Sequence, residues 1–287
     1  GERRRFETLW WQAGRYVELV IQTEDEPLTL HELELTETHY PLEMQSEFHC
    51  DDEATEGVIP IAIRGLQMCA HETYMDCPYY EQLMYIGDTR LEALVTYAIT
   101  GDDRLPRKAL RMFEASRLLS GLTQSRYPSR ETQIIPPFSL WWIAMVHDFA
   151  QWRGDRPLVR RIMPGVRGVI DYFLSCLNRD GLVERPNGWN FMDWVPDWRS
   201  GIPPEGQAGV SAPINWLLVL ALHYASELEE WLEEPELARR HQRCAMELAE
   251  RLTLTFLNRK RHLFADDLEL KHYSEHTQCL ALLSGQL

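Results

Sequence analysis

The sequence predicts a mainly α-helical protein, a hairpin array or barrel, that begins with a few β-strands. Near Asp51 the spacing of apolar residues changes from a period of two to one of about 3.6 residues. About eight helical segments follow with no strand pattern between them. Two long linkers rich in Pro, Gly and aromatic residues interrupt these helices. Long ordered loops between helices are often functional, so we expect them to gather at one end of the array.

The first part of the chain has the alternation of β-strands. In RYVELVIQ the apolar residues Val17, Leu19 and Ile21 occupy every second position, and LTLHELELTET repeats the pattern. Two or three strands cannot bury both of their faces alone. We therefore interpret residues 1–48 as the last strands of a β-sandwich domain, and residues 49–287 as the first part of a helical barrel.

The predicted helices begin after the cap-like Asp51 and Asp52. Two short motifs, GDDR at 101–104 and RGDRP at 153–157, each follow one helix and open the next, which indicates a repeated helical hairpin. The intervening linkers are residues 120–138 and 178–212. The helical segments are 53–72, 91–100, 105–119, 139–152, 157–177, 212–232, 236–257 and a last one from Tyr273.

Composition excludes several classes of function. The chain has 44 acidic and 29 basic residues, a formal charge of −15, which disfavours nucleic acid as a partner. No apolar run of about 18 residues predicts a membrane span. The six cysteines lack metal-binding spacing, so we expect buried thiols and no metal. The chain begins without Met and ends within a helical pattern, which indicates part of a longer protein and leaves location and oligomeric state open.

The stretch DCPYYEQLMYIGD, residues 76–88, places three carboxylates among apolar and aromatic neighbours. Burying a carboxylate is unfavourable unless a polar partner contacts it. Carbohydrate sites combine carboxylates, which bind hydroxyl groups, with aromatic faces, which cover the apolar side of a sugar ring. Glycoside hydrolysis in addition needs two carboxyl groups that flank the scissile bond. The linkers supply the aromatic residues, although core tryptophans and helix-capping acids would give a similar composition.

This stretch resembles the signature of the α-L-rhamnosidases of glycoside hydrolase family 78. The surrounding segments ETLWWQAGRYVELVIQT, CAHETYMDCPYYEQ, SRYPS, IIPPFSLWWI and WNFMDW are similar to that family as well. The resemblance implies an (α/α)6 six-hairpin barrel, here incomplete, that hydrolyses terminal α-L-rhamnose with inversion and without a cofactor. The matching residues of the signature are Asp76, Cys77, Pro78, Glu81, Gly87 and Asp88.

The resemblance also implies roles for individual residues. Glu81 matches the general acid, which has to carry a proton near neutral pH; apolar or acidic neighbours such as Tyr80, Met84 and Asp76 would favour that form. Asp76 and Asp88 match acids that bind the hydroxyl groups of rhamnose. For these two residues the alternatives are a turn acid before Pro78 and an N-cap of the following helix.

Aromatic residues of the linkers complete the predicted sugar site. Trp194 and either Trp141 or Trp142 resemble members of the aromatic wall around the sugar. Asp193 is a candidate sugar ligand, or else it organises its own loop. We interpret His71, His147 and His276 as structural residues rather than as members of a metal site or triad.

The chain departs from the family pattern at three points. Tyr80 stands where many relatives have Arg, and Met84-Tyr85 replaces Gly-Trp, although Tyr85 still offers an aromatic face. The loss of the cation leaves the aglycone, and even the sugar, open. The family's general base is a Glu expected beyond Leu287, with Glu275 as a substitute, so we expect these 287 residues alone to be inactive. The alternatives are another α/α-barrel glycosidase and a non-catalytic carbohydrate-binding protein.

Overall fold

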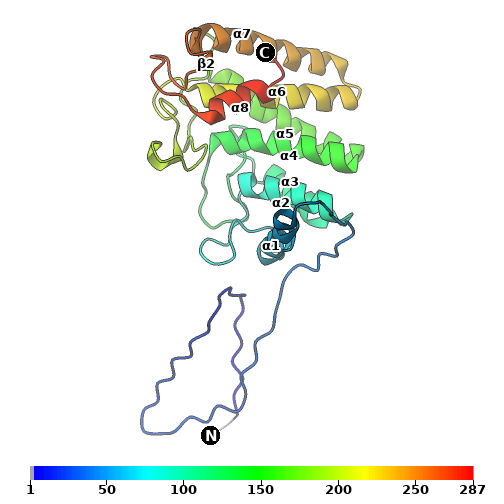
Figure 1. Cartoon of the computed structure of the whole chain (residues 1–287), viewed down its shortest axis with the longest axis vertical. Coiled ribbons are helices and arrows are strands. Elements are labelled where there is room, and N and C mark those ends of the chain that lie inside the picture. Colours follow the sequence, from blue (N-terminus) through cyan, green and yellow to red (C-terminus); the bar gives the residue numbers. More distant parts are fainter. Residues whose placement is uncertain (1–2, 287) are drawn as a thin grey trace.

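The computed structural model describes residues 3–286, and this part of the chain is mainly α-helical, as predicted (Figure 1). A short 3-10 helix, Arg199–Gly201, lies in the longest loop, and the strands β1 (Leu257–Asn258) and β2 (Leu263–Phe264) form an antiparallel ribbon. The α-helices are α1 Glu53–Cys69, α2 Ile86–Ile99, α3 Arg104–Ala115, α4 Pro136–Arg153, α5 Arg156–Ser175, α6 Ala212–Trp231, α7 Pro235–Phe256 and α8 Glu275–Leu283.

The helices form two layers. The even-numbered helices α2, α4, α6 and α8 make one row in which each packs on the next, and α3, α5 and α7 pack against that row. Because α4 and α6 have neighbours on several sides, almost every face of both helices is buried, including Trp142 and Trp216. The architecture is therefore an array of helical hairpins, with its core around α4 and α6.

The motifs GDDR and RGDRP lie at the connections between helices, as predicted. Gly154 adopts a left-handed conformation that ends α4, and the side chain of Asp155 accepts a 3.0 Å hydrogen bond from the N–H of Leu158 to begin α5. The guanidinium of Arg107 pairs with both Asp103 and Asp155. One arginine thus joins the two connections at the same end of the array.

The prediction of strands in residues 7–45 is wrong for this structure. Residues 3–50 are mostly extended, but they form no strand ladder, and Val17, Leu19 and Ile21 are all more than half exposed. An alternating segment becomes a strand only where a partner strand satisfies its backbone and a second layer covers its apolar face. Within the described residues the paired strands are β1 and β2 instead. The division into two domains at residue 48 stays a prediction.

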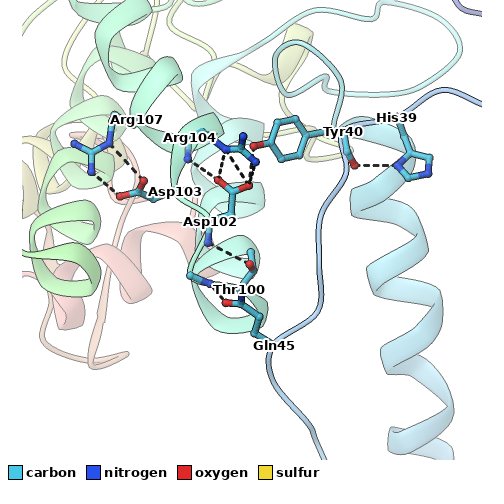
Figure 2. Close-up of polar contacts among 9 residues, drawn as sticks. His39, Tyr40, Gln45, Thr100, Asp102, Asp103, Arg104 and Arg107 are labelled. Atoms are coloured by element: carbon cyan, nitrogen blue, oxygen red, sulfur yellow. Dashed lines mark hydrogen bonds and ion pairs between the residues drawn. The ribbon is translucent and has the colours of Figure 1, made fainter.

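The leading segment is fastened to the end of the first hairpin (Figure 2). The Tyr40 hydroxyl donates a 2.7 Å hydrogen bond to Asp102, and the N–H of Gly101 donates to the side chain of Gln45. Burial and the Asp102 carboxylate raise the pKa of Tyr40 to about 12. Two backbone hydrogen bonds, from Tyr40 to Ala70 and from Gln45 to Ile99, complete the attachment.

The segments that precede α2, α4, α6 and α8 meet at one end of the array, as predicted (Figure 1). Tyr85 forms a backbone bridge with Arg126, and the N–H of Trp189 donates to Ile134. A further backbone bond joins Ala212 to Asp266. The acid-rich stretch and both long linkers therefore lie together, on the side where the even-numbered helices begin.

A buried ion pair ties α5 to α6. The guanidinium of Arg167 donates two hydrogen bonds of 2.7 and 2.8 Å to the carboxylate of Glu229, whose side chain is fully buried. Burial acts to raise the pKa of Glu229, but the bonds from Arg167 and His241 outweigh it and hold the pKa below its usual value. The pair therefore keeps its charges inside the helical layers.

Removing this carboxylate should destabilise the fold strongly. We expect Glu229→Ala to lower the free energy of unfolding by about 3 kcal/mol, because Arg167 is left buried without its counter-ion. The matched control is Asp171→Ala, which breaks an exposed ion pair between Asp171 and Arg240 and should cost less than about 1 kcal/mol. Chemical denaturation of both variants measures the difference; equal losses would contradict this account.

Candidate active site

The loop between α1 and α2 holds the predicted acids and is closed by Asp76. Its N–H donates to the carbonyl of Leu83 at 2.9 Å, and its Oδ1 accepts from the N–H of Leu83 at 2.8 Å. Near the tip, Gln82 has a positive φ of 53°, and its side-chain amide donates to the carbonyl of Pro78. Asp76 therefore shapes the loop, as the turn-acid alternative expects, and this role is compatible with a ligand contact.

Glu81 is exposed at the tip of this loop, and its N–H contacts Cys77 Sγ at 3.3 Å. The neighbours expected to enclose it do not do so: Tyr80 is 85% exposed and Met84 lies in the core. The group that Glu81 acts on is the hydroxyl of Tyr85. Burial, and then the Glu81 carboxylate, raise the pKa of Tyr85 to about 12. Glu81 thus projects from the surface beside a phenol that stays protonated.

Arg126 supplies a cation that the sequence analysis missed. Its Nη1 donates a 2.8 Å hydrogen bond to the Tyr85 hydroxyl, and its guanidinium carbon lies 5.5 Å from the centre of the Tyr85 ring. A positive charge therefore stands near Glu81, although Tyr80 occupies the position where an arginine was expected. The segment SRYPS carried this residue, but only its spatial pairing with Tyr85 shows what it contacts.

Asp88 lies in the first turn of α2. The helix begins at Ile86 and Tyr85 is its N-cap, so the alternative that Asp88 caps the helix is wrong. The pKa of Asp88 is raised, first by burial and then by the charges of Asp76 and Glu81. Because the exposed N–H groups of a first turn favour a carboxylate, the helix offsets part of this cost.

Glu92 is a buried acid that the sequence analysis also missed. It follows Asp88 by four residues and so lies on the same face of α2, a spacing that was readable in the sequence. Its Oε2 is buried without a hydrogen-bond partner. Burial, and then the charges of Asp88 and Asp76, raise the pKa of Glu92 to about 9. A protonated carboxyl group therefore lies one turn along α2 from Asp88.

A row of aromatic rings runs from the acid loop to the longest linker. Tyr85 meets Phe138 edge to face at 6.3 Å between ring centres, and Phe138 meets Phe191 at 5.9 Å. Phe191 in turn packs against Trp194 at 5.1 Å, and Trp194 is 70% exposed. The row connects α2, α4 and the linker before α6, and ends on an exposed indole.

The two adjacent tryptophans of α4 have different surroundings. Trp142 is fully buried in the core, whereas Trp141 is half-buried with the guanidinium of Arg90 5.2 Å from its ring centre. Arg90 also pairs with Asp148 at 2.7 Å. Of the two alternatives, Trp141 is the one that retains an accessible face, one helical turn along α4 from Phe138.

Asp193 is engaged by its own protein. Its Oδ1 accepts from the N–H of Trp194 at 2.7 Å, and its Oδ2 lies 2.9 Å from Nε2 of His276 at the start of α8. This arrangement favours the loop-organising alternative for Asp193. His276 also lines a groove of about 1400 Å³, together with Trp198 and Glu275.

The other two histidines make structural contacts, as predicted. His147 lies 2.7 Å from Glu227 and stacks on Tyr224, while His71 stacks on Trp11. Among residues 3–286, leaving aside the side chain of Glu53, no group of His, Cys, Asp and Glu side chains has an arrangement that would hold a metal ion. No helix in that described range has the length and apolar character needed to cross a membrane.

Comparison with known families agrees with this geometry. Residues 43–287 match the model of the bacterial α-L-rhamnosidase six-hairpin glycosidase domain. The chain belongs to this family. The resemblance drawn from the acid-rich stretch is thereby confirmed, and with it the six-hairpin fold.

Solved structures of rhamnosidases superpose on the chain. The family 78 rhamnosidase of Bacillus sp. GL1 is 27% identical with a TM-score of 0.78, over 86% of this chain and 26% of that one. The rhamnosidase of Klebsiella oxytoca with rhamnose bound is 21% identical with a TM-score of 0.73, over 83% of this chain and 45% of that one. An α-L-rhamnosidase from Aspergillus terreus, 15% identical, matches 86% of this chain and 30% of that one at a TM-score of 0.67.

This chain therefore spans less than half the length of each of these three rhamnosidases. No curated protein sequence matches it.

The protonated state of Glu92 predicts a pH-dependent stability. Because its pKa is higher in the folded protein than in the unfolded chain, stability falls as pH rises from the unfolded value, near 4.5, toward about 9. Glu92→Gln removes this penalty. We expect it to raise the free energy of unfolding by about 1 to 3 kcal/mol at pH 8 and to have little effect at pH 4. Denaturant titrations at the two pH values test this; a gain that does not depend on pH would contradict it.

Gly201 allows the long linker to pack against the aromatic row. It has a φ of +67°, and a Cβ there would lie 2.3 Å from the ring of Phe191. We expect Gly201→Ala to lower the free energy of unfolding by about 3 kcal/mol, from backbone strain and overpacking together.

Gly154→Ala is the matched control for this change. Gly154 has nearly the same φ, +66°, but no atom lies within 4 Å of the added Cβ. Only the strain of about 1 to 2 kcal/mol should remain there. Thermal unfolding of both variants provides the comparison, and equal losses would show that the Phe191 contact does not matter.

Proposed function

We propose that this chain carries the general-acid side of an α-L-rhamnosidase that hydrolyses terminal α-L-rhamnosides with inversion. The observation that supports the proposal most is Glu81, which is exposed at the end of the array where the other predicted acids and aromatic residues meet. Family membership supports the class of reaction. The names of the similar solved structures support rhamnose as the sugar.

In this mechanism Glu81 donates its proton to the glycosidic oxygen as the bond to the anomeric carbon breaks. Water attacks that carbon from the opposite face and gives its proton to a second carboxylate, which we expect to be a Glu beyond Leu287. The Tyr85 hydroxyl, which accepts a hydrogen bond from Arg126, has its own proton available for Glu81. This pair would orient the acid.

The remaining residues would bind the sugar. Asp76 and Asp88 accept hydrogen bonds from rhamnose hydroxyls, and the raised pKa of Asp88 reflects a carboxylate that lacks solvent and a cation before substrate arrives. Tyr85, Trp141 and Trp194 offer aromatic faces to the ring. Asp193 is a less direct contact, because His276 and the backbone already occupy its oxygens. The chemistry needs no cofactor.

Replacing the acid tests the proposal. In the full-length protein we expect Glu81→Gln to lower kcat/KM for rhamnosides with sugar or phenol leaving groups by about 10² to 10⁴-fold. Rhamnosyl fluoride, whose leaving group needs no proton, should lose far less. Glu72→Gln, at an exposed acid that pairs with Lys108, is the control and should leave both rates unchanged. Full activity of Glu81→Gln on all substrates would refute the assignment.

The substrate itself is tested with the unaltered full-length protein. A panel of nitrophenyl glycosides should give turnover with the α-L-rhamnoside and inverted rhamnose as the first product. Turnover of a different sugar would favour another glycosidase of the same fold. Binding of rhamnose without turnover of any substrate would favour a non-catalytic carbohydrate-binding protein.

A further inference from the structure

Two tryptophans from the leading segment reach the loop that carries Glu81. The segment doubles back on itself, and its turn near residue 10 faces the connection between α1 and α2 (Figure 1). Trp10 and Trp11 stack on each other with ring centres 5.9 Å apart. These residues lie more than 60 positions before the loop in sequence, so this contact was not visible to pattern analysis.

Trp11 fixes the position of this turn. Its ring lies 3.7 Å from that of His71 at an angle of 10° between the planes, and His71 is buried. Nε2 of His71 lies 3.1 Å from the carbonyl of Met68 at the end of α1. Burial lowers the pKa of His71, so the stacked ring is neutral near pH 7. The tryptophan pair is thereby attached to the rigid end of a helix.

Trp10 is held by its edge and keeps its face accessible. Its Nε1 donates a 2.6 Å hydrogen bond to Oε1 of Gln82, the residue directly after Glu81, yet the side chain is 49% exposed. On the other side of Glu81, Tyr79 and Tyr80 are 61% and 85% exposed and pack edge to face at 4.8 Å. Three accessible aromatic side chains therefore flank the proposed acid.

We propose that Trp10, with Tyr79 and Tyr80, binds the leaving group of the substrate and so determines which rhamnosides are cleaved. A general acid protonates the leaving oxygen, so the leaving group has to lie on the side of Glu81, whereas Asp76 and Asp88 hold the rhamnose. Accessible aromatic faces pack against a ring with an apolar face, whether the pyranose of a second sugar or the flat ring of a polyphenol. The inference rests on the proposed function.

The test compares leaving groups in the full-length protein. The substrates are a rhamnosyl disaccharide, a flavonoid rhamnoside and rhamnosyl fluoride, which share the sugar but differ in what departs. We expect Trp10→Ala to lower kcat/KM about tenfold for a ring-bearing substrate and to leave the fluoride within about twofold. Trp10→Phe, which keeps a ring, should recover most of the loss. The substrate with the larger loss identifies the natural leaving group as a sugar or a polyphenol.

Trp152→Ala is the matched control. Trp152 is 51% exposed, nearly the same as Trp10, but it lies at the opposite end of α4, where it stacks on Tyr97. It should leave all three substrates unchanged. An active protein in which Trp10→Ala affects no substrate, or affects the fluoride as much as the others, would overturn the inference and leave the proposed function intact. Failure of the unaltered protein to cleave any of the three would overturn both.

Discussion

The close approach of α2 and α4 at Gly87 determines how the site is assembled. A Cβ at this position would come within 3.0 Å of the ring of Phe138, so the ring can lie against the start of α2 only because residue 87 has no side chain. Phe138 then meets Tyr85 on one side and Phe191 on the other. The acid loop, α4 and the longest linker therefore have fixed relative positions. The glycine of the signature serves the packing of the site rather than its chemistry.

The electrostatics around α2 show how a cluster of acids is tolerated without a metal ion or an adjacent cation. Asp76 and Asp88 keep hydrogen bonds to backbone N–H groups, which stabilise carboxylates, while Glu92 gives up its charge instead. The nearby cation, Arg126, is paired through the Tyr85 hydroxyl rather than directly with an acid. Such a cluster favours an uncharged ligand with many hydroxyl groups, because these replace the lost water without adding negative charge.

Local patterns predicted the helices and the acid loop, and tertiary contacts decided the rest. The connections at Gly154 and Asp155 follow from backbone preferences, so sequence alone identified them. The start of α2 was placed five residues too late, because Gly87 read as a turn signal although its packing against Phe138 makes it helical. The strands before residue 48 failed for the related reason that alternation specifies a strand only when a partner is present.

Each helix packs mainly on its nearest neighbours along the chain, and this order has a consequence for synthesis. As the polypeptide leaves the ribosome, successive hairpins can settle on those already formed, because few contacts await distant segments. The acid loop emerges early, but Arg126 and Phe138 arrive only with the next hairpin, and Trp194 with the one after. Catalytic competence is therefore acquired late, after the supporting helices have folded.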